Sequence, residues 1–511
     1  MKSEAPPPVL NRGWITISIM LATFMQGVDT TIANVALPHM QGSMSASQDQ
    51  IAWVVTSYIV AAAIMTPLTG WLANRFGIKY VFLISVGGFT VASALCGAAG
   101  SLAQLVVYRL LQGVCGAALV PLSQAVLLQI NPPERHARAM AVWGMGVILG
   151  PIIGPALGGW LTDSYEWRWV FYINVPFGIL SAIGIMIFIH ETRHGRREPF
   201  DWFGFATLSF AIGALQMLLD RGELKDWFGS TEICVEATIA GLAFYLFVVH
   251  TATSTDRSFL DRALLKDANC MVGTLMMFIV GVPLYGTMTL LPTMLQDLMN
   301  YPVVTTGLVT APRGVGTMIA MILIARLAGR VDTRLIIFAG LSLTAIAMWQ
   351  MTGFSLYMGM GPIITTGLLQ GFGLGFVFTP LSIITFSTLP RHMLTQGTAI
   401  FSLMRNIGGS VGISIVEVLL DQNTQIVHSR LVEQLRPDNP LARSPWLQAP
   451  YSFTDPMGVA ALNAEATRQA AMVAYLDDFL LMMILVVIGV PLLLLLRRPR
   501  TPVAGGAIAL D

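Results

Sequence analysis

Residues 14–37 read WITISIMLATFMQGVDTTIANVAL, an apolar run that is interrupted by a single charged residue, Asp29. A membrane-spanning helix needs about 20 such residues to cross ~30 Å of hydrocarbon, so this run is long enough. Similar runs recur through the 511-residue chain, of which 55% is hydrophobic and only 11% charged. An ordinary soluble domain has roughly 25% charged residues. The sequence therefore predicts an all-α polytopic membrane protein.

We place fourteen spans, and each must be a helix because hydrocarbon offers the backbone no water to bond. The first run is too long for a signal-peptide core and lacks a small-residue cleavage site, so we interpret it as a span. The count falls to twelve if the seventh and eighth runs do not cross. The predicted spans are 14–37, 51–73, 80–99, 103–128, 139–161, 168–189, 202–219, 233–250, 270–295, 304–326, 335–353, 359–381, 397–420 and 477–496.

The distribution of Lys and Arg predicts the orientation. Alternate connections and the two termini hold nineteen of these residues, whereas the short connections on the other side hold only Arg168, Arg221 and Lys225. Because cytoplasmic loops are enriched in Lys and Arg, both termini are expected in the cytoplasm. This alternation also requires an even number of spans.

The overall charge and the cysteines argue against other classes of protein. The net charge of +1 gives no basic surface for nucleic acid. The cysteines have no paired spacing, so we interpret them as small apolar packing residues and predict neither a disulfide nor a metal site. They are Cys96, Cys115, Cys234 and Cys270.

Residues 421–476 form a long polar connection on the predicted non-cytoplasmic side. The stretch Asn463 to Asp478 has a helix-forming composition, and four prolines before it (Pro437, Pro440, Pro445 and Pro450) break regular structure. Long ordered loops are usually functional. A flexible insertion without a function stays an alternative.

Ionisable residues inside spans mark functional sites by default because burying a charge in a membrane is costly. Asp29 and Arg109 lie at similar depths, counted from the outer ends of spans 1 and 4. Pairing would lower the desolvation cost of both and keep the carboxylate ionised until the arginine is displaced. Asp29 is therefore a candidate proton carrier, and a permanent structural ion pair is the alternative. The other ionisable residues in spans are Arg313, Arg405, Glu236, Asp297 and Glu417.

Polar residues also follow helical stripes on these two spans. The stripe of span 1 contains Thr23, Gln26, Thr30 and Asn34, and that of span 4 contains Arg109, Gln112, Gly116 and Ser123. Gln112 and Ser123 would be surplus to a simple ion pair, so a wet cavity is favoured over direct helix contact. The candidate cavity residues are Thr23, Gln26, Thr30, Asn34, Gln112, Arg313, Arg405 and Asn406.

Span 5 carries glycines at four-residue spacing, interrupted by Pro151 and Pro155. Small residues at this spacing let helix backbones approach closely. We expect this helix to bend or slide where two halves of a transporter meet. Tight packing without such a role is the alternative. The glycines are Gly146, Gly150, Gly154 and Gly158.

Six stretches, in order along the chain, resemble motifs of the fourteen-span drug:proton antiporters of the major facilitator superfamily, most closely its EmrB-type exporters. The residues that carry the likeness are Gly27, Asp29, Thr30, Asn34 and Pro38; Gly70, Asn74, Arg75, Gly77 and Lys79; Arg109, Gln112, Gly113 and Gly116; Gly150, Pro151, Gly154, Pro155, Gly158 and Gly159; Trp167, Asn174 and Pro176; and Arg405, Asn406, Gly408, Gly409 and Gly412.

This resemblance implies a major facilitator fold: an N-terminal six-helix bundle in residues 1–190, two inserted spans in 191–268 and a C-terminal six-helix bundle in 269–511. The bundles would rock about a central site. Asp29 and Arg109 would couple proton movement to export, driven by the proton gradient without a cofactor. The resemblance also implies a bacterial inner membrane, an EmrA-like periplasmic membrane-fusion adaptor and a TolC-like outer-membrane channel.

One position departs from the motif. The loop between spans 2 and 3 commonly carries Asp where this chain has Asn74. An amide accepts a hydrogen bond but cannot form an ion pair, so loop 2–3 is expected to hold the inward-closed state less firmly.

The leading functional hypothesis is proton-driven efflux of amphipathic toxic compounds. Met-rich surfaces can repack around varied ligands, and the chain has 28 Met. A dedicated exporter of a siderophore, organic acid or fatty acid would use the same machinery. A membrane-embedded enzyme is disfavoured because no catalytic cluster or nucleotide-binding glycine loop occurs. A channel is disfavoured because the intramembrane charges are single residues instead of rings.

Overall fold

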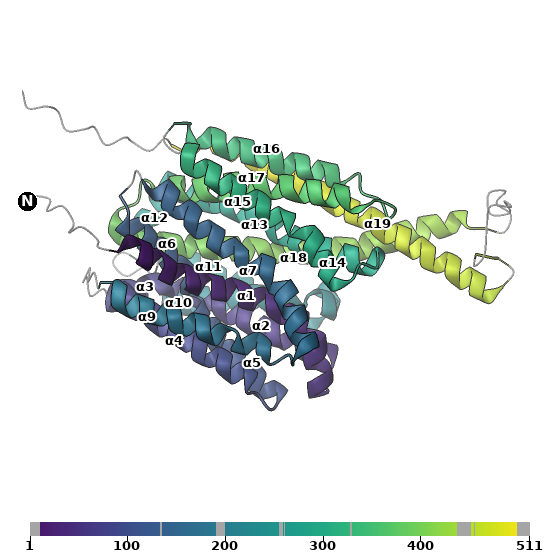
Figure 1. Cartoon of the computed structure of the whole chain (residues 1–511), viewed down its shortest axis with the longest axis horizontal. Helices are drawn as coiled ribbons and strands as arrows, with labels where there is room; N and C mark the ends of the chain where they lie inside the picture. Colours follow the sequence, from purple (N-terminus) through teal and green to yellow (C-terminus); the bar gives the residue numbers. More distant parts are fainter. Residues whose placement is uncertain are drawn as a thin grey trace, which may run out of the picture.

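The computed structural model describes residues 11–132, 135–190, 200–254, 259, 261–327, 330–436, 451–453 and 455–497. Within these ranges the chain is helical and contains no β-strand. Thirteen helices are long and apolar enough to cross a membrane, and a bent pair, α2 with α3, makes a fourteenth span. The prediction of an all-α membrane protein with fourteen spans is confirmed (Figure 1).

The first six spans form the N-terminal bundle. Three of them are single helices, α1, α4 and α7, and three are interrupted. The helices are α1 (Arg12–Met44), α2 (Gln48–Met65), α3 (Leu68–Phe76), α4 (Ile78–Gly97), α5 (Leu102–Gly116), α6 (Leu119–Ile130), α7 (His136–Ser164), α8 (Trp169–Tyr172) and α9 (Asn174–Phe188).

The last six spans form the C-terminal bundle and follow two additional helices, α10 (Trp202–Arg221) and α11 (Thr231–Thr253). Short helices connect the spans: η2 (Glu223–Lys225), η3 (Trp227–Gly229), α12 (Arg262–Lys266) and η5 (Arg391–Met393). The C-terminal spans are α13 (Ala268–Thr293) with η4 (Met294–Leu298), α14 (Val303–Thr310) with α15 (Pro312–Leu327), α16 (Thr333–Met351), α17 (Met360–Phe386), α18 (Leu394–Gln434), and α19 (Pro456–Gly489) with η6 (Val490–Leu494).

The two bundles repeat one packing pattern. In the N-terminal bundle α1 packs on α7 and α9, and α4 packs on α5 and α9. In the C-terminal bundle α13 packs on α18 and α19, and α16 packs on α17 and α19. Each helix thus has a counterpart in the other half, as the predicted fold of two six-helix bundles requires.

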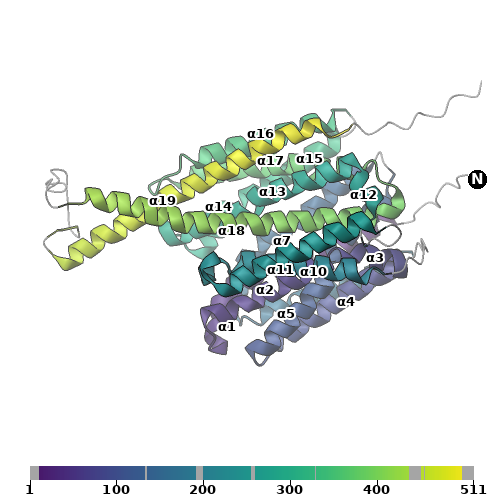
Figure 2. The ribbon, with the colours of Figure 1, turned by 180° about the vertical axis from the view of Figure 1, so that it is seen from behind.

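The start of α1 and the end of η6 lie at the same end of the bundles, which we call the terminal face; the opposite end is the distal face (Figures 1 and 2). The two faces are reached alternately along the chain. The bend of 55° between α2 and α3 lies near the terminal face, at Pro67. Proline lacks a backbone N–H and clashes with the preceding turn, which accounts for the break.

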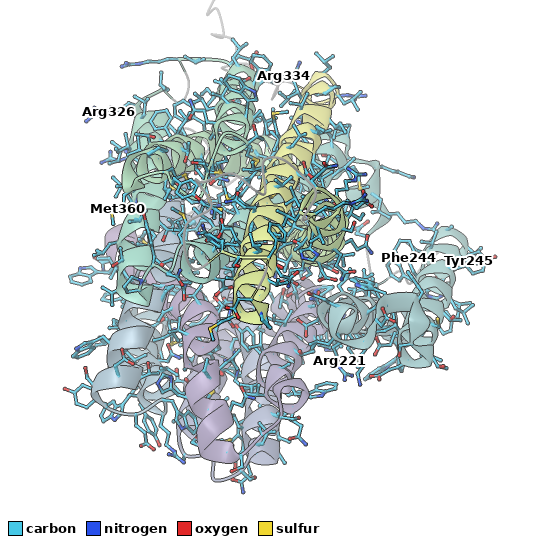
Figure 3. The ribbon with its side chains drawn as sticks, turned by 90° about the vertical axis from the view of Figure 1, so that its right-hand side faces the viewer. Arg221, Phe244, Tyr245, Arg326, Arg334 and Met360 are labelled. Carbon is cyan, nitrogen blue, oxygen red and sulfur yellow. The ribbon has the colours of Figure 1, made fainter. Side chains whose placement is uncertain are left out.

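The inserted helices pair with each other, but only α10 also packs on both bundles, through α2 and α18. Gln216 of α10 donates a hydrogen bond to Ser410 of α18 at 2.7 Å, and the Thr56 hydroxyl of α2 donates one to Asp220 of α10. Helix α11 lies at the periphery, where Phe244 and Tyr245 point outward (Figure 3). Helix α10 therefore bridges the two bundles.

The segment predicted as a long polar loop is largely helical. Helix α18 continues without interruption to Gln434, and α19 begins at Pro456, so the two helices project together beyond the distal face (Figures 1 and 2). His428 and Asn463 make a hydrogen bond of 3.0 Å between them. The predicted helix from Asn463 to Asp478 is confirmed, but it starts earlier. The four prolines lie in 437–450, outside the described residues.

Candidate functional site

Asp29 lies at the centre of a buried polar network in the N-terminal bundle. Its Oδ2 accepts a hydrogen bond from an Arg109 Nη1 donor at 2.7 Å. Its Oδ1 accepts bonds from Gln112 Nε2 and Asn174 Nδ2, each at 2.8 Å. Asp29 and Arg109 are 0% and 1% exposed. Three donors, one of them cationic, thus share the two oxygens of this carboxylate, and such charge-assisted hydrogen bonds are the strong ones.

Five helices position this network. Asp29 lies on α1, Arg109 and Gln112 one turn apart on α5, and Asn174 at the start of α9. Arg109 Nε also donates to the Val54 carbonyl of α2 at 3.0 Å. Asn174 Nδ2 additionally contacts Ser93 Oγ of α4 at 3.0 Å. Because the partners of Asp29 come from α5 and α9, a movement of either helix relative to α1 changes the hydrogen bonding of Asp29.

Aromatic rings cover the guanidinium of Arg109. Its Cζ lies 4.5 Å from the ring centroid of Tyr58 and 5.6 Å from that of Phe171. Cation–π attraction is strongest where water is excluded. The rings therefore stabilise a charge that burial would otherwise penalise, and they separate the ion pair from the surroundings of the bundle.

The structure confirms the predicted contact between Asp29 and Arg109, but it corrects the reason for expecting a cavity there. Gln112 is not surplus, because it bonds Asp29 and also accepts from Arg109 Nη1 at 2.9 Å. The Ser123 hydroxyl accepts a bond from the Trp143 indole at 2.9 Å and donates to Val120. Gln112 and Ser123 therefore meet protein partners, and the ion pair itself is buried.

The remaining stripe residues of α1 do not gather in one place. Thr23 is buried and bonds a backbone carbonyl of its own helix, as Thr30 does with Gly27. Gln26 is half-buried and Asn34 is exposed. Of the candidate cavity residues on α1 and α5, only Gln112 bonds the ion pair. The four stripe residues of α1 do not bond it.

The candidate arginines of the C-terminal half lie in separate environments. Arg313, at the start of α15, donates to the Leu284 carbonyl of α13 at 2.9 Å. Arg405 of α18 is buried, contacts the Asn406 side chain at 3.3 Å and lies 5.9 Å from the Phe378 ring. Among the residues that the structure describes, neither arginine forms an ion pair with a carboxylate, in contrast to Arg109.

Helix α7 lies where the two halves meet, as expected, but its glycines pack against α1. A Cβ on Gly150 would lie 2.7 Å from the Gly27 backbone, two residues from Asp29, and one on Gly158 would lie 2.7 Å from Ile32. Gly146 and Gly154 face Met20 and Thr31 of the same helix. The junction is made by another face of α7, where Gly144 meets Met321 and Trp143 stacks on Phe378.

Other motif glycines mark close helix contacts. Gly113 and Gly116 of α5 face Tyr58 of α2, and Gly116 also faces Phe89. Gly408 and Gly409 of α18 face Phe278 and Tyr285 of α13 in the same way.

The motif after span 2 lies on α3, beside the C-terminal bundle. A Cβ on Gly70 would lie 3.0 Å from the Gln396 Cα of α18, so the two bundles touch here at the terminal face. Gly77 ends α3 with a positive φ of 95°, which disfavours any residue with a side chain. Asn74 is half-buried and Arg75 is exposed.

The family model described as Major Facilitator Superfamily matches residues 19–413. The chain belongs to the major facilitator superfamily.

Relatives place it among the EmrB-type members of this superfamily. It is 38% identical to the multidrug export protein EmrB of Escherichia coli, over 88% of this chain and 87% of that protein. It is 35% identical to the fatty acid resistance protein FarB of Neisseria gonorrhoeae, over 96% and 97%. The structure of the human organic anion transporter MFSD10 has the same fold, with a TM-score of 0.60, 16% identity and coverage of 94% and 100%.

As a member of this superfamily the chain is a multi-pass membrane transporter and not an enzyme. Sequence reasoning missed Asn174 as a partner of Asp29. Asn174 was visible inside a superfamily motif, but nothing in its spacing connected it to a residue 145 positions away. Ser93, which accepts a hydrogen bond from Asn174, gave no signal at all. Asp220 and Asp478, both within helices that span the membrane, were missed as intramembrane acids; both Asp478 oxygens are buried without a partner.

Proposed function

We propose that this chain exports amphipathic toxic compounds across a bacterial inner membrane in exchange for protons, with its terminal face in the cytoplasm. The observation that carries the proposal is the dry ion pair of Asp29 and Arg109, closed by Gln112 and Asn174. A carboxylate on α1 that is held by donors from α5 and α9 is a proton-binding group whose affinity depends on how these three helices are arranged.

The proton cycle follows from this dependence. While the helices hold the arrangement described here, Arg109 neutralises Asp29 and no proton is needed. When the bundles rock and the α1–α5 contact loosens, the carboxylate loses its cationic partner and takes up a proton from the outer side. Return to the paired state releases that proton inward, because Arg109 again competes for the carboxylate.

The packing of α7 on α1 supports this coupling. Gly27 and Gly150 bring the two backbones together next to Asp29, while the opposite face of α7 contacts α15 of the other bundle. A rocking movement at the α7–α15 junction would therefore reach Asp29 through one helix–helix contact.

The proposal includes a three-part pump. The extensions of α18 and α19 project beyond the distal face, which lies in the periplasm in the proposed orientation (Figure 2). A rigid helical pair of this kind suits the docking of an EmrA-like adaptor that leads to a TolC-like channel. The relatives named for multidrug export support the cargo class.

A second candidate is export of one amphipathic metabolite, such as a fatty acid. The observation that favours it is the likeness to a fatty acid resistance protein over nearly the whole chain. The two candidates share the same machinery and differ in the range of cargo.

Transport in proteoliposomes tests the proposal. The purified protein is reconstituted, a pH gradient is imposed and uptake is measured for lipophilic cations, neutral amphiphiles, fatty acids, organic acids and siderophores. Gradient-dependent uptake of several unrelated amphiphiles is expected. Uptake of fatty acids alone would establish the second candidate, and uptake unaffected by collapsing the pH gradient would contradict proton coupling.

A further inference from the structure

A second carboxyl group is buried in the C-terminal bundle, on α19. Asp478 is 1% exposed, and neither of its oxygens has a hydrogen-bond partner among the described residues. It is thus the opposite of Asp29, whose two oxygens accept three hydrogen bonds. Buried polar groups are nearly always hydrogen-bonded, so this exception needs an explanation.

The surroundings of Asp478 are apolar. Ala474 and Met482, one turn away on either side, are both buried. A Cβ on Gly286 of α13 would lie 2.9 Å from the Met482 sulfur, so the two helices are closely packed here. An ionised carboxylate in such a place would have neither water nor a donor, and a carboxyl group avoids that cost by holding a proton.

The cations of the helices that pack on α19 do not compensate Asp478. Helices α13 and η6 have no charged residue, and the single charged residue of α16, Arg334, lies at its start near the terminal face. Arg405 of α18 lies against α17, and Arg468 of α19 bonds Glu465. A negative charge on Asp478 would therefore be unbalanced.

The nearby acids make a negative charge on Asp478 still less favourable. Asp477 precedes it on α19 and is exposed. The acids of α18, Glu417 and Asp421, lie against η2 instead, next to Glu223.

Polar groups lie between Asp478 and the distal face. Tyr475 is one turn nearer to that face, and its hydroxyl donates to Thr293 Oγ1, at the end of α13, at 3.2 Å. Asp297 of η4 and Asp478 both act electrostatically on Tyr475. Because Thr293 and Asp297 are exposed, water at the distal end of the bundle can reach this hydroxyl pair.

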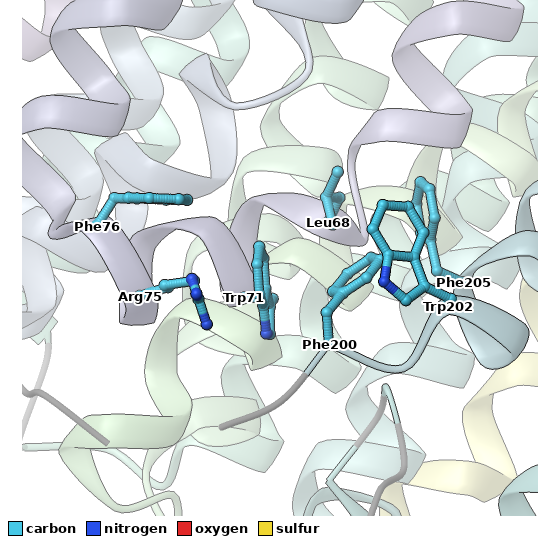
Figure 4. Close-up of a pocket in the computed structure, with 7 residues that line it drawn as sticks. All are labelled: Leu68, Trp71, Arg75, Phe76, Phe200, Trp202 and Phe205. Atoms are coloured by element: carbon cyan, nitrogen blue, oxygen red, sulfur yellow. The ribbon is translucent and has the colours of Figure 1, made fainter. Parts of the chain in front are cut away.

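Towards the terminal face the surroundings of α19 stay apolar. The pocket at that face lies between α3 and the start of α10, and no residue of α19 lines it (Figure 4). Protons therefore have a polar route to Asp478 only from the distal side. The buried residues that follow Asp478 on α19 and η6 are Phe479, Met482, Val486, Gly489 and Leu493.

We propose that Asp478 is a proton-binding site, loaded from the distal face, whose proton allows α19 to pack on α13 and α16.

The site would connect pH at the distal face with the projecting helices. Ionised Asp478 needs water or a donor, which the packed bundle does not offer, so loss of the proton loosens α19. The packed state is therefore complete while the proton is bound and weakens as pH rises. Because α19 is continuous from Pro456 to Gly489, its loosening also moves the end that projects beyond the distal face (Figure 1).

Infrared spectroscopy of the purified full-length protein tests the proton on Asp478. A protonated carboxyl group gives a C=O stretching band that an ionised carboxylate lacks. The wild type should show this band near neutral pH and lose it as pH is raised to about 10. Asp478→Asn should lack the band at every pH. Asp477→Asn, which removes the exposed neighbouring carboxylate, should keep it.

The same band reports the route. It shifts when deuterium replaces the proton, and this shift should be slower in Tyr475→Phe, which lacks the hydroxyl between Asp478 and the distal face.

Amide hydrogen exchange tests the link to the packing of α19. Peptides that cover residues 472–486 should exchange faster in the wild type than in Asp478→Asn, and the difference should grow as pH rises. Asp478→Leu should behave as Asp478→Asn does, because both side chains stay neutral. A single monodisperse peak on size exclusion verifies that these variants are folded.

The proposal is wrong if the wild type and Asp478→Asn have the same carboxyl band, because Asp478 would then be ionised. It is also wrong if the band persists to about pH 10 and hydrogen exchange does not differ, because Asp478 would then be a permanently neutral packing residue. An equally fast deuterium shift in Tyr475→Phe would contradict loading along the distal route.

Discussion

Asp29 has enough partners to be fully satisfied without water: one guanidinium and two amide donors share its two oxygens. Removal of one partner from a buried ion pair typically costs about 3–5 kcal/mol, because the other charge is left without compensation. A carboxylate can avoid this cost by taking up a proton, whereas an arginine cannot release one. Asp29 is therefore the member of the pair that can alternate between a protonated and an ionised form, whereas Arg109 stays charged.

Arg109→Ala should therefore abolish pH-gradient-driven transport, with uptake in proteoliposomes falling to that of protein-free vesicles. The unpaired Asp29 would stay protonated and could not release its proton inward. Arg109→Lys should retain part of the activity, because an ammonium preserves the charge but loses the bond to Val54. Full gradient-driven uptake by Arg109→Ala would exclude the ion pair from coupling.

At the scale of helices, the close contact between α1 and α7 fixes the position of Asp29 in the bundle. The two backbones cross where Gly150 meets Gly27, so any side chain at Gly150 meets backbone atoms, which cannot rotate away. Gly146 meets only the flexible end of Met20, and nothing lies within 4 Å of a Cβ on Gly159. The three glycines therefore differ in how well they would tolerate a larger side chain, although they lie on one helix.

Gly150→Ala should separate α1 from α7, destabilise the protein by roughly 1–3 kcal/mol as overpacking does, and strongly reduce transport. Gly159→Ala is the matched control and should change neither the stability nor the transport rate. Gly146→Ala should have effects between those of the other two variants. Thermal unfolding in detergent and uptake in proteoliposomes measure the two effects. Equal behaviour of Gly150→Ala and Gly159→Ala would show that the crossing does not position Asp29.

A second contact between elements depends on pH. Glu223 of η2 shares a hydrogen bond with Glu417 of α18, and burial raises the pKa of Glu223, with the nearby Asp421 raising it further. A raised pKa means that the folded protein penalises the charged form. The stability contributed by the protonated carboxyl is complete below the usual pKa of 4.5 and is lost as pH rises through the folded value.

The wild type should therefore lose thermal stability relative to Glu223→Gln as pH is raised from about 5 to about 8. Glu433→Gln, which alters an exposed carboxylate of α18, should follow the wild type. Parallel stability curves for the wild type and Glu223→Gln would show that Glu223 titrates normally. Differential scanning fluorimetry across this pH range makes the comparison.

The whole molecule consists of two bundles, a bridging helix α10 and a projecting helical pair. The projecting ends of α18 and α19 pack on each other beyond the distal face, whereas Asp29 lies inside the N-terminal bundle, so these ends need not contribute to transport itself. Its surface exposes apolar residues such as Ile426, Met457 and Val459, which a partner could cover.

Replacing residues 428–464 by a short Gly-Ser linker should impair drug resistance of whole cells while leaving uptake in proteoliposomes near the wild-type rate. The linker would remove the contact of His428 with Asn463 but keep Arg468, which reaches the Leu298 carbonyl of the bundle. Equal loss in both assays would mean that the extensions support the fold instead of docking an adaptor.

Much of this architecture could be predicted from sequence because hydropathy and charge act locally. The spans, their even number and the similar depth of Asp29 and Arg109 all follow from positions along single helices. The roles of Gln112 and Asn174 could not, because they depend on how five helices pack. The extension of α18 was missed because polarity indicates exposure to water, not loss of helix; a polar helix persists where a neighbouring helix packs on it.

The central claim is that protons cross this protein through Asp29. Proteoliposomes that contain a pH-sensitive dye report proton movement when a transported compound is added. The wild type should show proton flux opposite to the compound, and so should Asp163→Asn, which removes an exposed carboxylate of the same bundle. Asp29→Asn should bind the compound but show no coupled proton flux. Proton flux by Asp29→Asn at the wild-type rate would contradict the account.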